Sequence, residues 1–493
     1  MYPTMEDIRK IAAKGQYKRV PVCRELYADR YTPVEMMRTL REASRHCYLL
    51  ESASQTEVWG RYSFLGYEPL MEITCTDGIM KIRRTEGADK EEITKQVAHP
   101  GDTLREILKE YKSPVMEDMP PFTGGLVGYF SYDYIKYSEP KLKLGEHEDP
   151  DFRDMDLMLF DQVIAFDHYR QKVLLITGVM LDDLENSLRK AEQKLQEMAD
   201  LIRSGKKAEL PPLQLDSEIR PQFPKEKYCQ MVEKAKHYIH EGDIFQVVLS
   251  NPMRAKAEGS LFDTYRVLRA TNPSPYMFYF SSDDIELAGA SPETLVKLEN
   301  KKLTTFPLAG TRPRGKTKQE DRELEEGLLK DEKELAEHNM LVDLGRNDVG
   351  RVCDFGSVKV SDYKAIKRFS HVMHITSKVT GQLSADKDVL DALRAVFPAG
   401  TLSGAPKIRA CEIIDELEPE RRGIYGGGMG YLDFGGNMDI CITIRTMVKK
   451  NDRVYIQAGG GIVADSVLDN EFQETVNKAG ACMTALRMTA EEE

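Results

Sequence analysis

The sequence predicts an α+β (mixed α/β) fold. One observation is a set of short apolar segments in the amino-terminal part, bounded by polar turns as antiparallel strands are. A second is a long amphipathic helix near the middle of the chain. A third is the alternation of apolar strands with charged helices over the second half. No repeat of fixed period and no low-complexity tract interrupts this pattern.

In chain order, strands are expected at 164–166 and 173–176. A helix follows at 183–204, because one stripe carries Leu184, Leu188, Ala191, Leu195, Met198 and Leu201. The segment 206–225 holds four prolines and no apolar period, so we expect a surface linker between region 1–205 and region 226–493. The second region is expected to hold helices at 226–241, 319–344 and 466–489, and strands at 244–249, 440–447 and 454–457.

Composition and charge exclude several classes of protein. The 493 residues are 41% hydrophobic and 30% charged, as in ordinary globular chains. The net charge of −12 disfavours nucleic acid and anionic lipid as partners. The longest stretch without a charged side chain, between Asp118 and Asp133, has 14 residues and is too short to span a membrane. The eight scattered cysteines and the polar start of the chain indicate a reduced, cytoplasmic protein without a signal peptide.

Two E-x-x-E pairs are candidates for a cation site. Glu334 and Glu337 share one face of a predicted helix, and Glu471 and Glu474 repeat the spacing in a second helical context. If the two pairs face each other, their oxygens suit a hard cation such as Mg²⁺. The alternative is that each pair is a solvated helix face.

Two glycine-rich segments resemble phosphate-binding loops. At 458–461, Ala458 and three glycines follow a strand, which suits either an anion-binding nest or a tight turn. The chain ends too soon after it for a dinucleotide-binding unit. Residues 310–317 match the Walker A pattern, but Pro313 removes a backbone donor and the preceding strand is a poor buried one. We therefore disfavour a nucleotide site, although a P-loop hydrolase stays an alternative.

Three single residues are ambiguous by themselves. His374 alternates with apolar neighbours, as either a core residue or a catalyst does. Arg445 is expected inside the apolar strand 442–447, where a buried guanidinium needs an anionic partner. Tyr425 precedes three glycines, where its hydroxyl lines a pocket or its ring joins the core.

Taken together, the motifs strongly resemble those of the chorismate-utilising enzymes, and within that family the large subunits of anthranilate synthases. The resemblance covers essentially the whole chain. It is carried by 242–246 (GDIFQ), 290–293 (ASPE), 307–311 (PLAGT), 337–344 (EHNMLVDL), 372–374 (VMH) and 458–474. It implies antiparallel β-sheets packed together with helices on the outside, an amino-terminal regulatory or structural region and a carboxy-terminal region that binds chorismate.

The resemblance also implies roles for the candidate residues. Glu337 and Glu474 match direct ligands of Mg²⁺, and Glu334 and Glu471 match residues that hold metal-bound waters. The residues that match substrate contacts are Arg445 and Tyr425 at the enolpyruvyl carboxylate, and Gly459, Gly460, Gly461 and Lys478 at the ring carboxylate. Glu293 matches a general acid for the C4 hydroxyl, and Thr311 and His374 match positions beside the reacting ring.

Two positions indicate which reaction of the family to expect. Gln246 stands where water-adding members have a lysine base, and glutamine cannot act as a base. Ala309 stands where many aminodeoxychorismate synthases have a nucleophilic lysine. We therefore expect amination of chorismate at C2, loss of the C4 hydroxyl and release of pyruvate; the alternatives are aminodeoxychorismate synthase component I and a non-catalytic binding subunit. Because no cysteine lies in a G-x-C-x-G turn, we expect a separate glutamine amidotransferase subunit.

A further pair of segments resembles a tryptophan feedback site. The residues that match are Glu51 and Ser52 in one segment, Pro275, Tyr276 and Met277 in the other, and Tyr431. Glu51 suits the ammonium group of the amino acid. The resemblance therefore implies feedback inhibition by tryptophan, and ordinary domain packing is the alternative.

Overall fold

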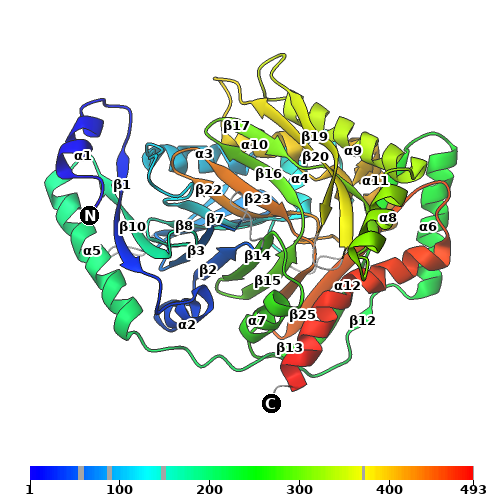
Figure 1. The fold of residues 1–493 in the computed structure, drawn as a ribbon, viewed down its shortest axis with the longest axis horizontal. Coiled ribbons are helices and arrows are strands. Elements are labelled where there is room, and N and C mark those ends of the chain that lie inside the picture. The colour runs from blue at the N-terminus through cyan, green and yellow to red at the C-terminus, as the bar shows by residue number, and fades with distance from the viewer. Residues whose placement is uncertain (54–59, 86–91, 146–151, 369–371, 492–493) are drawn as a thin grey trace.

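A computed structural model describes residues 1–53, 60–85, 92–145, 152–368 and 372–491. Two large sheets, of 13 and 12 strands, form the body, with antiparallel pairing along both. Helices lie around the sheets (Figure 1). The predicted fold class, antiparallel sheets packed together with outer helices, is confirmed.

The bounds of the elements are as follows. The first sheet has, in spatial order, β1 (Arg19–Tyr27), β10 (Lys172–Met180), β9 (Val163–Asp167), β3 (Tyr62–Tyr67), β2 (Cys47–Glu51), β14 (Tyr276–Ser281), β15 (Ile285–Ser291), β24 (Thr446–Lys450), β25 (Arg453–Ile462), β13 (Gln246–Glu258) and β11 (Gln214–Leu215), with β12 (Arg220–Pro221) and β21 (Gly404–Ala405) also on β13. The second has β18 (Leu308–Pro313), β20 (Val372–Gln382), β17 (Lys302–Thr305), β16 (Thr294–Glu299), β23 (Met438–Ile442), β22 (Gly428–Asp433), β7 (Gly125–Phe130), β8 (Met155–Phe160), β4 (Met71–Thr76), β5 (Ile79–Arg84) and β6 (Glu92–Gln96), with β19 (Lys359–Arg368) on β20. The helices are α1 (Met5–Ala12), α2 (Pro33–Ala43), α3 (Pro100–Glu110), α4 (Ile135–Ser138), α5 (Leu184–Ser204), α6 (Lys225–His240), α7 (Phe262–Thr271), α8 (Lys318–Leu328), α9 (Glu332–Gly350), α10 (Val389–Val396), α11 (Lys407–Leu417) and α12 (Leu468–Glu491), with short 3₁₀ turns η1 (Tyr132–Tyr134) and η2 (Gly400–Leu402).

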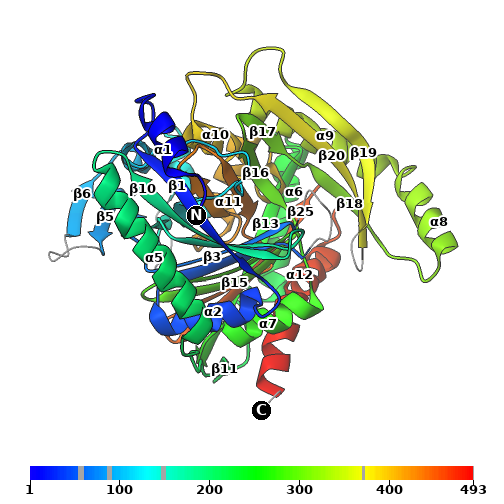
Figure 2. The same ribbon diagram turned by 60° about the vertical axis from the view of Figure 1, so that its left-hand side comes forward.

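The core has layers because strand side chains alternate between two faces. In β14, Met277 and Tyr279 pack on the side of the first sheet that α2, α5, α7 and α12 cover. Phe278 and Phe280 point the other way, into an aromatic-rich layer shared with strands of the second sheet. Figure 2 shows α5, α2 and α7 lying over the first sheet. The sheets therefore pack face to face, with helices outside.

Strands from both predicted sequence regions pair with each other in both sheets. In the first sheet β2 pairs with β14, and in the second sheet β7 pairs with β22. The segment 206–225 runs between the regions and contributes the two short strands β11 and β12. Both sheets therefore depend on residues from each side of that segment.

Several expected elements are confirmed. The strands at 164–166 and 173–176 are β9 and β10, and the helix at 183–204 is α5, with Ala191, Leu195 and Met198 buried. The expected helix at 319–344 is two helices, α8 and α9. Asp331 causes the break, because its side chain accepts the backbone N–H groups of Lys333 and Glu334 and so begins a new helix.

Two expectations in the second half are wrong. The expected strand 440–447 is two strands in different sheets, because the chain leaves β23 at Ile442 and enters β24 at Thr446. The glycines at 459–461 form neither a nest nor a turn; they lie inside β25, which continues to Ile462. The apolar pattern could not show either feature, since apolar residues continue through both halves of 440–447 and glycine is a weak predictor of strand.

Among the described residues, no helix is long and apolar enough to span a membrane. All eight cysteines are free thiols, as expected, and seven of them are buried.

Candidate active site

Two crossovers between the sheets lie side by side. The chain passes from β15 in the first sheet to β16 in the second through Pro292 and Glu293, and it returns from β23 to β24 through 443–445. The crossovers are bonded to each other: Ile442 N–H donates to the Glu293 carbonyl at 3.0 Å, and Ala290 N–H donates to the Arg445 carbonyl at 3.1 Å. This pairing brings together two candidate residues that are 152 positions apart, from 293 to 445.

Arg445 therefore belongs to a crossover between the two sheets. The expectation from the sequence that it lies inside a strand is wrong. Its φ of +51° places it in the left-handed region, which costs energy for a residue with a side chain. Burial lowers the pKa of its guanidinium, and within the described part of the chain no carboxylate forms an ion pair with it. A half-buried cation that forms no ion pair with the described residues is suited to binding an anionic ligand.

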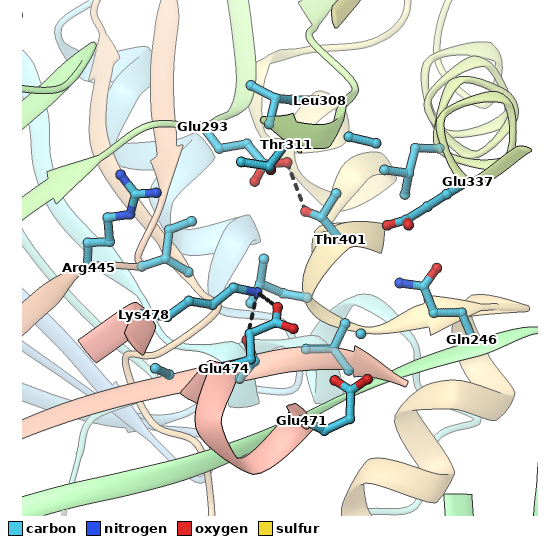
Figure 3. Close-up of a pocket in the computed structure, with 18 of the residues that line it drawn as sticks. Gln246, Glu293, Leu308, Thr311, Glu337, Thr401, Arg445, Glu471, Glu474 and Lys478 are labelled. Carbon is cyan, nitrogen blue, oxygen red and sulfur yellow. Dashed lines mark hydrogen bonds and ion pairs between the residues drawn. The ribbon is translucent and has the colours of Figure 1, made fainter. Parts of the chain in front are cut away.

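A cavity of about 580 Å³ opens beside these crossovers (Figure 3). Most of the predicted chorismate and metal residues line it: Gln246, Glu293, Thr311, Glu334, Glu337, Tyr425, Arg445, Gly459, Gly461, Glu471, Glu474 and Lys478. Two predicted residues lie just behind this lining, Gly460 and His374. Segments far apart in the sequence therefore meet at one site.

The four glutamates come from two helices that reach the cavity from different sides. Glu334 and Glu337 lie on α9, and Glu471 and Glu474 lie on α12. Burial raises the pKa of Glu337, and the neighbouring carboxylates of Glu334 and Glu474 raise it further. Glu471 Oε2 is buried and has no hydrogen-bond partner among the described residues.

The four glutamates of α9 and α12 bring an excess of negative charge to the cavity, and their side chains offer only oxygen donors to a cation. Arg312 contacts Glu334 at 3.3 Å and Lys478 contacts Glu474 at 2.6 Å, but the described residues give Glu337 and Glu471 no ion pair. Carboxylate oxygens are the donors that a hard divalent cation such as Mg²⁺ prefers, but no three of these four glutamates bring ligand atoms within 4.8 Å of one another in this structure.

Glu293 enters the cavity from the crossover between β15 and β16, and Figure 3 shows its carboxyl group apart from those of Glu337, Glu471 and Glu474. Burial raises the pKa of Glu293 to about 7. Thr401, in the turn η2, donates a hydrogen bond to Glu293 Oε1 at 2.9 Å. A carboxyl group with this pKa is partly protonated near neutrality, as a general acid must be.

The glycines of β25 make room for other side chains of the cavity. A Cβ at Gly459 would lie 2.8 Å from Tyr425 Oη, and one at Gly461 would lie 2.5 Å from Gln246 Nε2. A Cβ at Gly460 would lie 3.1 Å from Glu471 Oε2. Gln246 itself is 5% exposed, and its Oε1 is a buried acceptor without a partner. The glycines are therefore required for close approach of these side chains to the strand.

His374 is placed behind Thr311 in neighbouring strands. The two residues face each other across β18 and β20, and His374 Nδ1 lies 3.0 Å from Thr311 Oγ1 and 3.0 Å from the Gly310 carbonyl oxygen. Burial lowers the pKa of His374, which favours its neutral form near pH 7.

The Walker-like segment has no free phosphate cradle. Residues 310–313 lie in β18, and the backbone N–H groups of Gly315 and Lys316 donate to the carboxylates of Asp321 and Glu320. These amides are therefore unavailable for a phosphate group.

A second cavity, of about 320 Å³, lies between β2, β14 and β22, and all six predicted inhibitor residues line it: Glu51, Ser52, Pro275, Tyr276, Met277 and Tyr431. Charged groups that line this cavity form hydrogen bonds with other side chains of the protein. Glu51 accepts hydrogen bonds from Tyr265 Oη at 2.5 Å and Arg269 Nε at 2.6 Å. Tyr276 Oη donates to Asp439 at 2.8 Å and lies 2.9 Å from Thr294 Oγ1.

Sequence reasoning missed several lining residues of the first cavity. Thr401 contacts Glu293 from a turn, and Lys333 lines the cavity beside the first E-x-x-E pair. Thr401 carries no pattern that would single it out. Lys333 could have been found, because it adjoins Glu334 on the same helix.

The chain is similar to known proteins both in sequence and in fold. Residues 13–484 match the family described as chorismate binding enzyme. The chain is 43% identical to an anthranilate synthase component 1 of Acetivibrio thermocellus, over 99% of each chain. It resembles the crystal structure of anthranilate synthase component I from Streptococcus pneumoniae with a TM-score of 0.75 and 39% identity, covering 86% of this chain and 92% of that one. The menaquinone-specific isochorismate synthase MenF of Escherichia coli shares the fold, with a TM-score of 0.69 and 19% identity over 98% of both chains.

Proposed function

Since this chain belongs to the family of chorismate-binding enzymes, we infer that it is the chorismate-converting component of an anthranilate synthase. It converts chorismate and ammonia to anthranilate and pyruvate, a lyase reaction. The observation that carries this conclusion is one cavity lined both by a carboxyl group with a pKa of about 7, Glu293, and by four glutamates from two helices. Ala309 and Gln246 also line that cavity, so neither a nucleophilic lysine nor a lysine base stands at these positions.

Two anionic groups of chorismate require cationic partners. We assign Arg445, with the hydroxyl of Tyr425, to the enolpyruvyl carboxylate, because Arg445 is a half-buried cation that lines the cavity and forms no ion pair with the described residues. We assign Lys478 and the backbone of Gly459, Gly460 and Gly461 to the ring carboxylate. Lys478 Nζ already lies 3.0 Å from the Gly459 carbonyl oxygen, at this end of the cavity.

We propose Glu337 and Glu474 as direct ligands of Mg²⁺, and Glu334 and Glu471 as holders of its bound waters. The buried, unpartnered Glu471 Oε2 and the raised pKa of Glu337 support this assignment. When bound, Mg²⁺ supplies positive charge that holds the ring carboxylate and offsets the negative charge of the site.

The chain's own residues then handle the protons. Glu293 gives its proton to the C4 hydroxyl, which leaves as water while ammonia bonds to C2. Gln246 cannot remove a proton, and ammonia does not need a base to act as a nucleophile. Loss of the C2 proton and release of pyruvate restore the aromatic ring, and Thr311 with the neutral His374 behind it is placed to assist this step.

The name component 1 of the relatives implies a second component. We propose that this partner is a glutamine amidotransferase that supplies ammonia, because none of the eight cysteines lies in a nucleophile turn. We also propose that tryptophan binds in the second cavity, where aromatic side chains and Glu51 suit its indole ring and ammonium group. Tyr276 in that cavity is bonded to Thr294, next to Glu293, which provides a short connection between the cavities.

The test is a product analysis with purified chain, chorismate, ammonium at alkaline pH and Mg²⁺. We expect anthranilate, detected by its fluorescence, and pyruvate in equal amounts, both lost with a chelator or with Glu474→Ala. Aminodeoxychorismate without pyruvate would overturn the proposed reaction, and turnover that survives the chelator would overturn the proposed role of the metal.

A further inference from the structure

Lys478 binds the same carboxylate that is proposed as a metal ligand. Its Nζ lies 2.6 Å from Glu474 Oε1, one turn earlier on α12, and 3.0 Å from the carbonyl oxygen of Gly459 on β25. Figure 3 shows the ammonium between the glutamate and the glycine strand. The side chains of Lys478 and Glu474 are 49% and 44% exposed, so both can change partner without disturbing the core.

Lys333 makes a useful contrast. It also lines the cavity, one residue before Glu334, yet it forms no ion pair with any of the four glutamates among the described residues. Its charge lowers the pKa of Glu337 and Glu471 only from a distance. Both lysines line the cavity, but among the described residues only Lys478 is in direct contact with one of the four glutamates.

We propose that Lys478 competes with a divalent cation for Glu474, and that binding of the cation transfers the Lys478 ammonium to the ring carboxylate of the substrate. This inference rests on the proposed function of the same cavity. It makes Lys478 the residue that couples binding of the metal to binding of chorismate.

The two cations compete through electrostatic repulsion. One carboxylate oxygen cannot hold an ammonium at 2.6 Å and a metal ion together without strong repulsion between the two cations. The displaced ammonium remains beside the glycine strand, where the substrate carboxylate is proposed to bind. Because coupling between two ligands is reciprocal, the metal tightens chorismate binding by the same factor as chorismate tightens metal binding.

The first experiment measures Mn²⁺ affinity by the EPR signal of free Mn²⁺, with chelator-treated full-length chain. We expect Lys478→Met to bind Mn²⁺ about tenfold more tightly than the parent chain, because a competing cation has been removed. Lys478→Arg, which keeps the charge, should stay within about twofold, and Lys333→Met should change the affinity by less than about threefold. Equal or weaker Mn²⁺ binding by Lys478→Met would overturn the proposal, and so would an equal gain in Lys333→Met.

The second experiment repeats the Mn²⁺ titration with chorismate present and no ammonia source. In the parent chain we expect chorismate to tighten Mn²⁺ binding about tenfold, and in Lys478→Met about threefold or less. A coupling that is unchanged in Lys478→Met would overturn the transfer of the ammonium. Absence of Mn²⁺ binding in the parent chain and in every variant would instead overturn the metal site of the proposed function, and this inference with it.

Discussion

The two cavities differ in how their polar groups are satisfied. In the first, the described residues provide no hydrogen-bond partner for the buried atoms Gln246 Oε1 and Glu471 Oε2, and no ion pair for Arg445. In the second, Glu51 is held by Arg269 and Tyr265. Buried polar atoms without partners are costly, so the first cavity has polar groups arranged for ligands. In the second cavity Glu51 is satisfied without a ligand, and a ligand that binds there has to share Glu51 with Arg269.

This difference predicts the size of the effect of mutation. Changes in the first cavity remove groups proposed to contact the substrate or the metal, so they should affect binding and chemistry strongly. Changes in the second should affect the regulatory ligand and leave turnover intact.

The largest effect is expected for Glu293→Gln. The amide keeps the shape and can still accept the hydrogen bond of Thr401, but it cannot give a proton to the C4 hydroxyl. We expect kcat with chorismate, ammonium and Mg²⁺ to fall about 10³-fold, while chorismate binding measured by calorimetry changes little. A kcat within tenfold of the parent value would contradict the assignment of Glu293 as the acid.

The next effect is on the metal. Glu337→Gln removes one carboxylate from a site with excess negative charge, and we expect Mn²⁺ affinity to fall about 100-fold. Glu332→Gln is the matched control, because Glu332 is an exposed residue on the same helix and does not line the cavity. If the two variants lose Mn²⁺ affinity equally, the effect comes from net charge and Glu337 is not a ligand.

A smaller effect is expected in the second cavity. Glu51→Gln removes the charge proposed to meet the ammonium of tryptophan, so the calorimetric Kd for tryptophan should rise about tenfold. Turnover without tryptophan should stay within about twofold, since Glu51 does not line the first cavity. The exposed Glu42 on α2 supplies the control, Glu42→Gln. Loss of turnover in Glu51→Gln at an unchanged melting temperature would show that the cavities are not separable.

The sequence predicted which residues line the two cavities where spacing and motif carried the information. The E-x-x-E spacing correctly placed Glu334 with Glu337 and Glu471 with Glu474, because two residues three apart on a helix share a face. The six residues of the second cavity were found by resemblance, and all of them line it.

What the sequence could not predict are features set by long-range contact. The crossover at Arg445 looks like continuous strand, since hydrophobic alternation does not reveal which sheet each half joins. The glycines of β25 were expected in a loop, because their role depends on Tyr425 and Gln246 approaching from other segments. Thr401 was missed because only the fold brings it 2.9 Å from Glu293.

The smallest predicted effect is a pH dependence that comes from that same contact. The pKa of Glu293 is raised to about 7, so its acid form is present below that value and is lost as the pH rises through it. At a constant concentration of free ammonia, kcat should fall about fivefold between pH 7 and pH 8, following the protonated fraction. The hydrogen bond from Thr401 lowers the pKa of Glu293, so Thr401→Val should move this limb to higher pH, and Thr401→Ser should restore it. A merely structural role of Thr401 would lower kcat at every pH without moving the limb, and a shift to lower pH would contradict the role of Glu293 as the proton donor held by Thr401.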